Sequence, residues 1–190
     1  IDEMKEMGMF GMLIPEEYGG LEVDLGTYWR VASELSRGWM SLGGVINSHT
    51  ITAFLINRFG TEEQKAHYLP RMASGELRAA LAMTEAEAGS DVAAIRTVAK
   101  PVGDGYVING SKMFITNGER ADLICLLART DTSAEKPHRG MSMLLVDRGA
   151  GLSSGRTIDK LGYNGIETVP LTFEDMKVPS EAVLGGTPNK

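Results

Sequence analysis

Two segments of this chain place polar groups at the ends of predicted strands, where a ligand could bind. The apolar run of residues 79–83 ends in Thr84, and a small acidic loop follows that closes on Gly89, Ser90 and Asp91. A buried strand that ends in a Gly/Ser loop leaves backbone N–H groups and hydroxyls that a polar ligand can satisfy. This segment therefore predicts a strand followed by a possible ligand-binding loop.

A second predicted strand ends in the same way, at Thr116 after Met113, Phe114 and Ile115. Two strand-end threonines could donate hydrogen bonds to a planar heterocycle that has carbonyl and ring-nitrogen acceptors. Phe114 would supply an aromatic surface beside such a ring. Strands also often end in threonine before an ordinary turn, so the spacing alone leaves both interpretations open.

Other kinds of site find little support in the sequence. His49, His67 and His138 have no second ligand at metal-binding spacing, so no metal site is predicted. Cys125, the single cysteine, lies in an apolar strand, and we expect a buried, inert thiol. The sequence has neither a Gly-x-Ser-x-Gly elbow nor a phosphate loop ending in Gly-Lys-Ser/Thr.

The composition is typical of a soluble globular protein, with 43% hydrophobic and 23% charged residues. No apolar window reaches the roughly 18 residues that span a bilayer, and no secretory leader is recognisable. We therefore expect a location in the cytoplasm, or in the mitochondrial matrix if the source is eukaryotic. The net charge is −6, of which −5 falls in residues 1–77. Neither half has the basic excess that nucleic-acid binding requires, and the nearly neutral second half suits an anionic ligand better.

The first part of the chain, residues 1–77, has helical periodicity and is predicted to be a helical domain. Helices are expected at 27–37, ended by Gly38, and at 42–59, ended by Gly60. Thr61 and Gln64 form a capping box for a third helix, which Pro70 should end or kink.

From residue 78 onward the hydrophobic period changes to two, which is typical of strands. The segments 103–105, 109–110 and 117–118 suit tight turns between antiparallel strands. The predicted fold class is α+β, with an N-terminal helical domain (1–77) packed on a middle antiparallel β-barrel-like domain (78–190). The predicted strands are 78–84, 92–100, 105–109, 112–116, 122–130, 141–147, 153–160 and 168–176.

Four motifs, in the right order over nearly the whole chain, resemble the acyl-CoA dehydrogenase family. Residues 83–91, Met-Thr-Glu-Ala-Glu-Ala-Gly-Ser-Asp, resemble the family's first signature, usually Thr-Glu-Pro-x-Ala-Gly-Ser-Asp. Residues 106–118, Tyr-Val-Ile-Asn-Gly-Ser-Lys-Met-Phe-Ile-Thr-Asn-Gly, resemble its second flavin segment, and residues 14–20 and 173–179 are similar as well. Ala86 stands where the family usually has proline, and Phe114 where tryptophan is common.

The resemblance implies FAD as the cofactor, an acyl-CoA as the substrate, and a fragment of the family fold without its C-terminal helical domain. Thr84 would bond the pyrimidine side of the flavin, Phe114 would pack on the face away from the substrate, and Thr116 would bond near the reactive nitrogen. Ser90 would also bond the substrate. A donor near that nitrogen stabilises the reduced flavin. The implied cofactor contacts are Leu81, Met83, Thr84, Gly89, Ser90, Phe114, Ile115 and Thr116.

In this family a glutamate of the C-terminal domain removes the α-proton while the β-hydride goes to the flavin. No catalytic residue is therefore assigned within this chain. Glu85 and Glu87 are expected to be solvated or to cap the flavin loop. The resemblance also implies oxidation of fatty or branched-chain acyl-CoA, an electron-transferring flavoprotein as acceptor, and a homotetramer or dimer in the intact protein.

Several alternatives remain open. Acyl-CoA oxidases, nitroalkane oxidases and flavin monooxygenases share the fold, and a binding module without flavin is a further possibility. Retention of Thr84, Ser90 and Thr116 argues against such a module, because it would not need these hydroxyls.

We expect the 190-residue chain alone to have no dehydrogenase activity and to hold FAD weakly. The reason is that the resemblance places the base and much of the FAD site in the C-terminal domain and neighbouring subunits. Acyl-CoA-dependent dye reduction by the purified chain should stay at background, and turnover above background would contradict this expectation.

Overall fold

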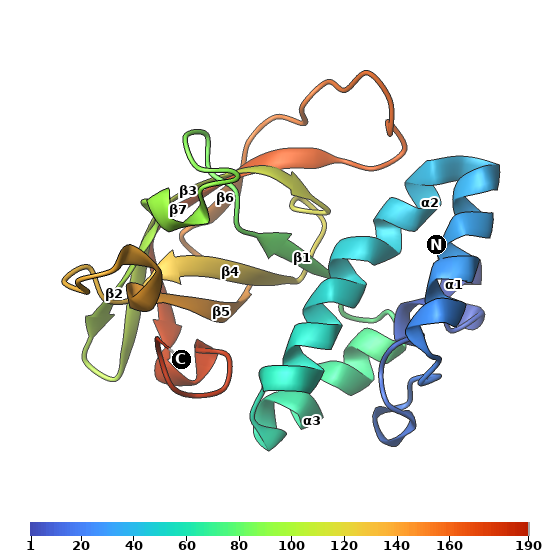
Figure 1. The fold of residues 1–190 in the computed structure, drawn as a ribbon, viewed down its shortest axis with the longest axis horizontal. Coiled ribbons are helices and arrows are strands. Elements are labelled where there is room, and N and C mark those ends of the chain that lie inside the picture. The colour runs from blue at the N-terminus through green and yellow to red at the C-terminus, as the bar shows by residue number, and fades with distance from the viewer. Residues whose placement is uncertain (190) are drawn as a thin grey trace.

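The computed structural model describes residues 1–189, in which a group of helices flanks one side of a curled β-sheet (Figure 1). In the figure, α2 lies directly beside β1, and the two elements are in contact. The helices are α1 (Asp2–Glu6), α2 (Leu25–Phe59) and α3 (Glu62–Ala73). The strands are β1 (Ala79–Ala82), β2 (Val98–Val102), β3 (Gly105–Thr116), β4 (Leu123–Arg129), β5 (Met141–Asp147), β6 (Leu152–Ser154) and β7 (Thr168–Pro179).

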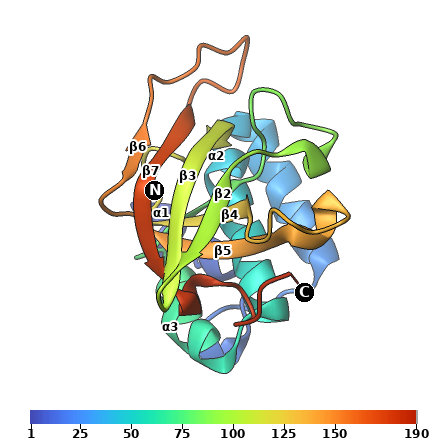
Figure 2. The ribbon, with the colours of Figure 1, turned by 90° about the vertical axis from the view of Figure 1, so that its left-hand side faces the viewer.

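The seven strands form one sheet in the order β1-β4-β2-β3-β7-β6, with β5 paired to β4 (Figure 2). The prediction of a helical part on a curled β domain is confirmed. The sheet is mixed, however, and not wholly antiparallel as predicted, because β4 runs parallel to β1 and to the start of β2. A parallel pair needs a crossover between its strands, and here β2 and β3 lie between β1 and β4 in the sequence.

Strand β4 is buried on both faces, which explains its continuous apolar sequence. Cys125 packs in the cluster shared with the helices, whereas Ile124 and Leu126 pack in the interior of the curled sheet. The predicted burial of the thiol is confirmed, since Cys125 is fully buried, and burial raises its pKa to about 12.

The helical segments follow the sequence signals with two differences. The two segments predicted on either side of Gly38 meet at Trp39, whose backbone is extended (φ −159°, ψ 107°) within α2. The capping box is confirmed: the Gln64 N–H donates to Thr61 Oγ1 at 3.2 Å, and the Thr61 N–H donates to Gln64 Oε1 at 3.1 Å. Pro70 does not end α3, which continues to Ala73.

Several predicted strand boundaries are wrong. Residues 92–94 form a 3₁₀ turn, so β2 begins only at Val98, and β6 is three residues long where 153–160 was predicted. The 103–105 turn does join the paired strands β2 and β3. The turn after β3 leads to β4, with which β3 does not pair.

The predicted turn at residues 109–110 is absent, because β3 runs straight through it. Gly110 has φ +144°, and a Cβ there would lie 2.7 Å from the Cα of Thr97 on the neighbouring segment. Glycine is needed at this position because two backbones approach closely, and not because the chain reverses.

His49 links the helical part to the sheet. Its ring is fully buried, with Nδ1 accepting from the Ala79 N–H at 3.4 Å and Nε2 lying 3.2 Å from the Phe10 carbonyl oxygen. These partners define a neutral ring that carries its proton on Nε2. Burial lowers the pKa of His49 to about 4.

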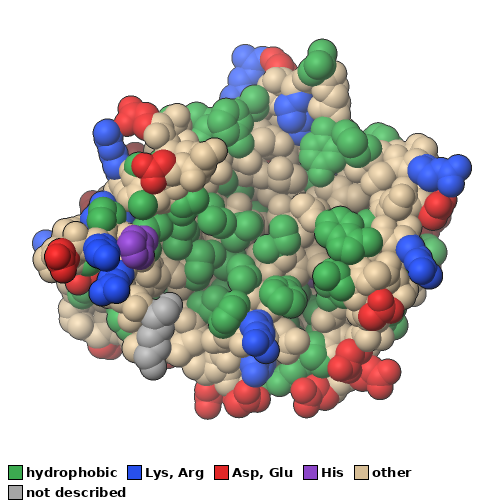
Figure 3. Space-filling model, viewed as in Figure 1, with side chains coloured by type: hydrophobic (Ala, Val, Ile, Leu, Met, Phe, Trp, Pro, Cys, Tyr) green, Lys and Arg blue, Asp and Glu red, His purple; other side chains and the backbone are tan. Residues whose placement is uncertain are grey.

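Hydrophobic side chains gather on the surface where the sheet meets the helices (Figure 3). Leu55, Leu81, Met143 and Leu184 lie partly buried against the cluster between the two parts, and Phe54 on α2 is 53% exposed. Within the described residues, no helix is both long and apolar enough to cross a membrane.

We predict that His49 makes stability depend on pH. The unfolded chain accepts a proton near the ordinary histidine pKa of 6.5, whereas the folded protein resists protonation down to about 4. The free energy of unfolding should therefore fall as the pH drops through this window, by on the order of 3 kcal/mol. In chemical denaturation at stepped pH, His49→Gln should lose this slope, and His138→Gln, at an exposed site, should keep it. Identical slopes in both variants would refute the assignment.

We also predict that Gly110→Ala destabilises the protein by about 1–3 kcal/mol, because the new Cβ would meet the Thr97 backbone. Gly162→Ala is the control, since its Cβ would have no neighbour within 4 Å. Denaturant midpoints of the two variants provide the measurement. An unchanged midpoint for Gly110→Ala would mean that the close approach is not needed.

Candidate functional site

The two segments selected from the sequence lie side by side in the structure. The chain leaving β1 passes next to the middle of β3, where the Met113 N–H donates to the Thr84 carbonyl oxygen at 2.8 Å. One residue earlier on β3, Lys112 Nζ donates to the Met83 carbonyl oxygen at 2.9 Å. Residues 83–84 and 112–113 are thus joined through both backbone and side chain.

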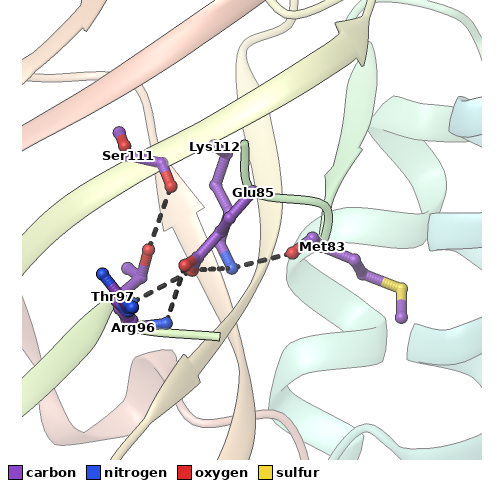
Figure 4. A network of polar contacts seen from close by, with 6 residues as sticks. All are labelled: Met83, Glu85, Arg96, Thr97, Ser111 and Lys112. Carbon is purple, nitrogen blue, oxygen red and sulfur yellow. Dashed lines mark hydrogen bonds and ion pairs between the residues drawn. The ribbon is translucent and has the colours of Figure 1, made fainter. Parts of the chain in front are cut away.

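A buried ion pair strengthens this junction (Figure 4). Lys112 Nζ lies 2.9 Å from Glu85 Oε1, with the Lys112 side chain fully buried and that of Glu85 9% exposed. The carboxylate also accepts the N–H groups of Arg96 at 2.7 Å and Thr97 at 3.0 Å. The prediction that Glu85 is either solvated or a cap is wrong about solvation, because the Glu85 carboxylate is enclosed by protein. Glu87 is exposed and pairs with the Arg96 guanidinium at 2.8 Å.

The surroundings favour the charged form of Glu85, whereas burial works against the charge on Lys112. Burial by itself raises the pKa of Glu85, but hydrogen bonds from Thr97, Arg96 and Lys112 outweigh burial and hold this pKa below its usual value. Burial lowers the pKa of Lys112, and the adjacent Glu85 carboxylate opposes that shift. A carboxylate with three donors and an ammonium with two acceptors satisfy the condition for burying charge.

Strand β3 bulges directly after Lys112. Its pairing with β7 shifts between Lys112 and Ile115, because one extra residue is inserted on β3. Phe114 lies within this bulge with φ +61° and 60% of its surface exposed. A bulky residue in the left-handed region costs on the order of 1–3 kcal/mol. The strained backbone places an aromatic ring on the surface beside the end of β1.

Hydroxyl groups around this surface are free for a ligand. Within residues 1–189, the hydroxyls of Thr84, Ser90 and Thr116 make no hydrogen bond to protein groups. Thr84 and Thr116 are half-buried, while Gly89 and Ser90 lie on an exposed turn that follows the paired residues Glu85 and Ala88. Free hydroxyl donors beside an exposed aromatic ring fit a flat ligand with ring acceptors, such as a flavin.

Two of the predicted contact residues also pack within the protein. The Ile115 side chain is 2% exposed and belongs to the core of the curled sheet, so only its backbone is available to a ligand. Leu81 packs toward the cluster shared with the helices. A separate cleft of about 890 Å³ lies between α3, β5 and β7, and none of the predicted site residues lines it. Across residues 1–189 no group of three metal-ligating side chains is present.

Reasoning from the sequence missed Lys112 and the role of Glu85. One signal was available in the sequence. Lys112 lies four residues after the apolar Ile108 in a predicted strand region, and an even spacing puts both side chains on the same, inward face of the strand. Such a charge requires a partner, and Glu85 follows the adjacent strand end. No sequence pattern identifies Arg96 and Thr97 as donors, because their backbone N–H groups take part.

Comparisons with known proteins identify the family of this chain. The sequence profile of the acyl-CoA dehydrogenase middle domain matches residues 80–176, and that of the N-terminal domain matches residues 1–76. The short-chain-specific acyl-CoA dehydrogenase of Clostridium acetobutylicum is 44% identical over 190 residues, covering 97% of this chain and 50% of the relative.

Solved structures give the same result. An acyl-CoA dehydrogenase from Geobacillus kaustophilus superposes with a TM-score of 0.94 at 43% identity, covering 100% of this chain and 50% of that one. A glutaryl-CoA dehydrogenase from Mycobacterium smegmatis in complex with FADH₂ superposes at 0.88 with 29% identity, over 99% and 47%. The chain spans about half the length of these relatives. With its N-terminal and middle domains both matched, this chain belongs to the acyl-CoA dehydrogenase family.

Proposed function

We propose that the protein containing this chain is an FAD-dependent acyl-CoA dehydrogenase that forms a double bond between Cα and Cβ of an acyl-CoA thioester. The observation that carries this proposal is the junction of residues 83–84 with residues 112–113, which brings the strand end at Thr84 next to the bulge that carries the exposed Phe114 ring. Family membership supports it, as does the FADH₂ named for the Mycobacterium smegmatis relative.

In this proposal, residues of the chain orient the cofactor and the substrate. Thr84 and Thr116 donate hydrogen bonds to the flavin ring, and Phe114 packs against one of its faces. Ser90, on the exposed turn, bonds the acyl-CoA at the place where substrate and cofactor meet. Leu81, Met83, Gly89 and the backbone of Ile115 complete the cofactor surface. When bound, FAD supplies the acceptor for the hydride that leaves Cβ.

The α-proton is removed by a glutamate from a helical domain outside residues 1–190. Hydrophobic side chains gather on the surface where the sheet meets the helices (Figure 3), and Leu81 and Met143 lie partly buried against the cluster there. Such a surface suits coverage by further helices, which supports this proposal. Within the chain, we propose a division into two domains near residues 77 and 78. An electron-transferring flavoprotein as acceptor, a homotetramer, a place in fatty-acid β-oxidation and a soluble compartment follow from the family resemblance.

We predict that the full-length protein purifies with a bound flavin, which acyl-CoA bleaches under anaerobic conditions. Visible spectra recorded with acyl-CoA thioesters of several chain lengths would test this. A protein that takes up no FAD would contradict the proposal. A flavin that no acyl-CoA reduces would instead point to one of the other flavin enzymes on this fold.

Thr116→Val should slow flavin reduction by acyl-CoA roughly 10-fold to 100-fold, because it removes a donor that stabilises charge developing on the flavin. Thr172→Val, on β7, makes the same chemical change at another half-buried position and should have little effect. Stopped-flow reduction rates provide the comparison. Equal rates for the two variants would exclude Thr116 from the site.

A further inference from the structure

Burying the Glu85–Lys112 pair costs free energy. Removing two charges from water costs several kcal/mol per ion, and an apolar pair of similar volume is often equally or more stable. The pair lies 2.9 Å apart with essentially no exposure. Stability alone therefore does not explain why two charges are buried here. The segments that the pair holds in place offer another reason.

The pair connects three segments that are separate in sequence. Glu85 accepts from the backbone of residues 96–97 at the entry to β2, and Lys112 belongs to β3. Lys112 also reaches the Met83 carbonyl oxygen on the chain leaving β1. Thr84 is thus held from both sides, by the carbonyl of the residue before it and by the side chain of the residue after it.

The same pair adjoins the strained bulge. Lys112 is the last residue of β3 in register with β7 before Phe114, and the intervening Met113 donates its N–H to Thr84. A surface phenylalanine with a left-handed backbone conformation persists only when several surrounding contacts fix its backbone. The contacts on this side of the bulge are those made by Lys112 and Met113.

We propose that Glu85 and Lys112 are positioning residues that hold Thr84 and the Phe114 bulge in one fixed relation, so that both meet the same cofactor. The inference rests on the proposed function, because the cofactor is FAD. Neither side chain needs to touch the flavin. The pair acts through the Met113–Thr84 hydrogen bond and the carbonyl of Met83.

The test uses the full-length protein with Glu85→Gln and Lys112→Met combined, which removes both charges at nearly constant volume. Glu87→Gln, which removes an exposed charge from the same loop, is the control. Three quantities are measured: the unfolding temperature, hydrogen exchange of the Met113 amide without FAD, and the dissociation constant of FAD. The exchange measurement needs no FAD and does not depend on the proposed function. A full-length protein that binds no FAD would contradict the proposed function, but the exchange rate of its Met113 amide would still test the role of the pair.

The double variant should unfold within a few degrees of the parent, yet its Met113 amide should exchange at least tenfold faster and FAD should bind at least tenfold more weakly. Glu87→Gln should match the parent in all three quantities. Parental exchange and parental FAD affinity in the double variant would overturn the proposal.

Lys112→Arg provides a second variant in case the double variant does not fold. It keeps the charge but moves the donors, so the same two shifts are expected, and their absence would overturn the proposal equally.

Discussion

A charge enclosed by protein must have its hydrogen-bonding capacity met within the fold, and this condition governs the centre of the β domain. The Glu85 carboxylate takes donors from β3 and from the entry to β2, and Lys112 takes acceptors from the chain leaving β1. Any shift of one segment would leave a buried charge without a partner, which costs far more than the net gain from making the pair. The three segments are therefore held in a single arrangement, and the surface that carries Thr84 and Phe114 depends on it.

The helical part is attached to the same sheet by polar contacts as well as by packing. His49 receives the Ala79 N–H and contacts the Phe10 carbonyl oxygen, while Asn117 Nδ2 donates to the carbonyls of Gly44 and Val45 at 3.3 Å. Asn117 follows directly after β3, with φ +63°. The strand that carries the candidate site is thus fixed to α2 at its end, in addition to its bonds with residues 83–84.

These contacts enclose the groups that position Thr84 and Phe114. The free hydroxyls and the Phe114 ring lie on the surface, whereas the groups that position them are enclosed. A site built on a strand pair with enclosed supporting contacts loses little freedom when a ligand binds, which favours affinity. The exposed turn at Gly89 and Ser90 lies outside this supported region.

Features whose causes are local could be predicted from the sequence. The capping box at Thr61 and Gln64, the hairpin at 103–105 and the buried strand around Cys125 all depend on neighbouring residues or on a simple period. The order of motifs was also enough to identify the family. The tertiary structure decided features that depend on residues far apart in sequence. Gly110 passes through a strand because the Thr97 backbone lies against it, and Glu85 is enclosed because Lys112 reaches it across 27 positions. A local pattern cannot contain such information, because the partner that satisfies a buried charge or excludes a Cβ is brought near only by the fold.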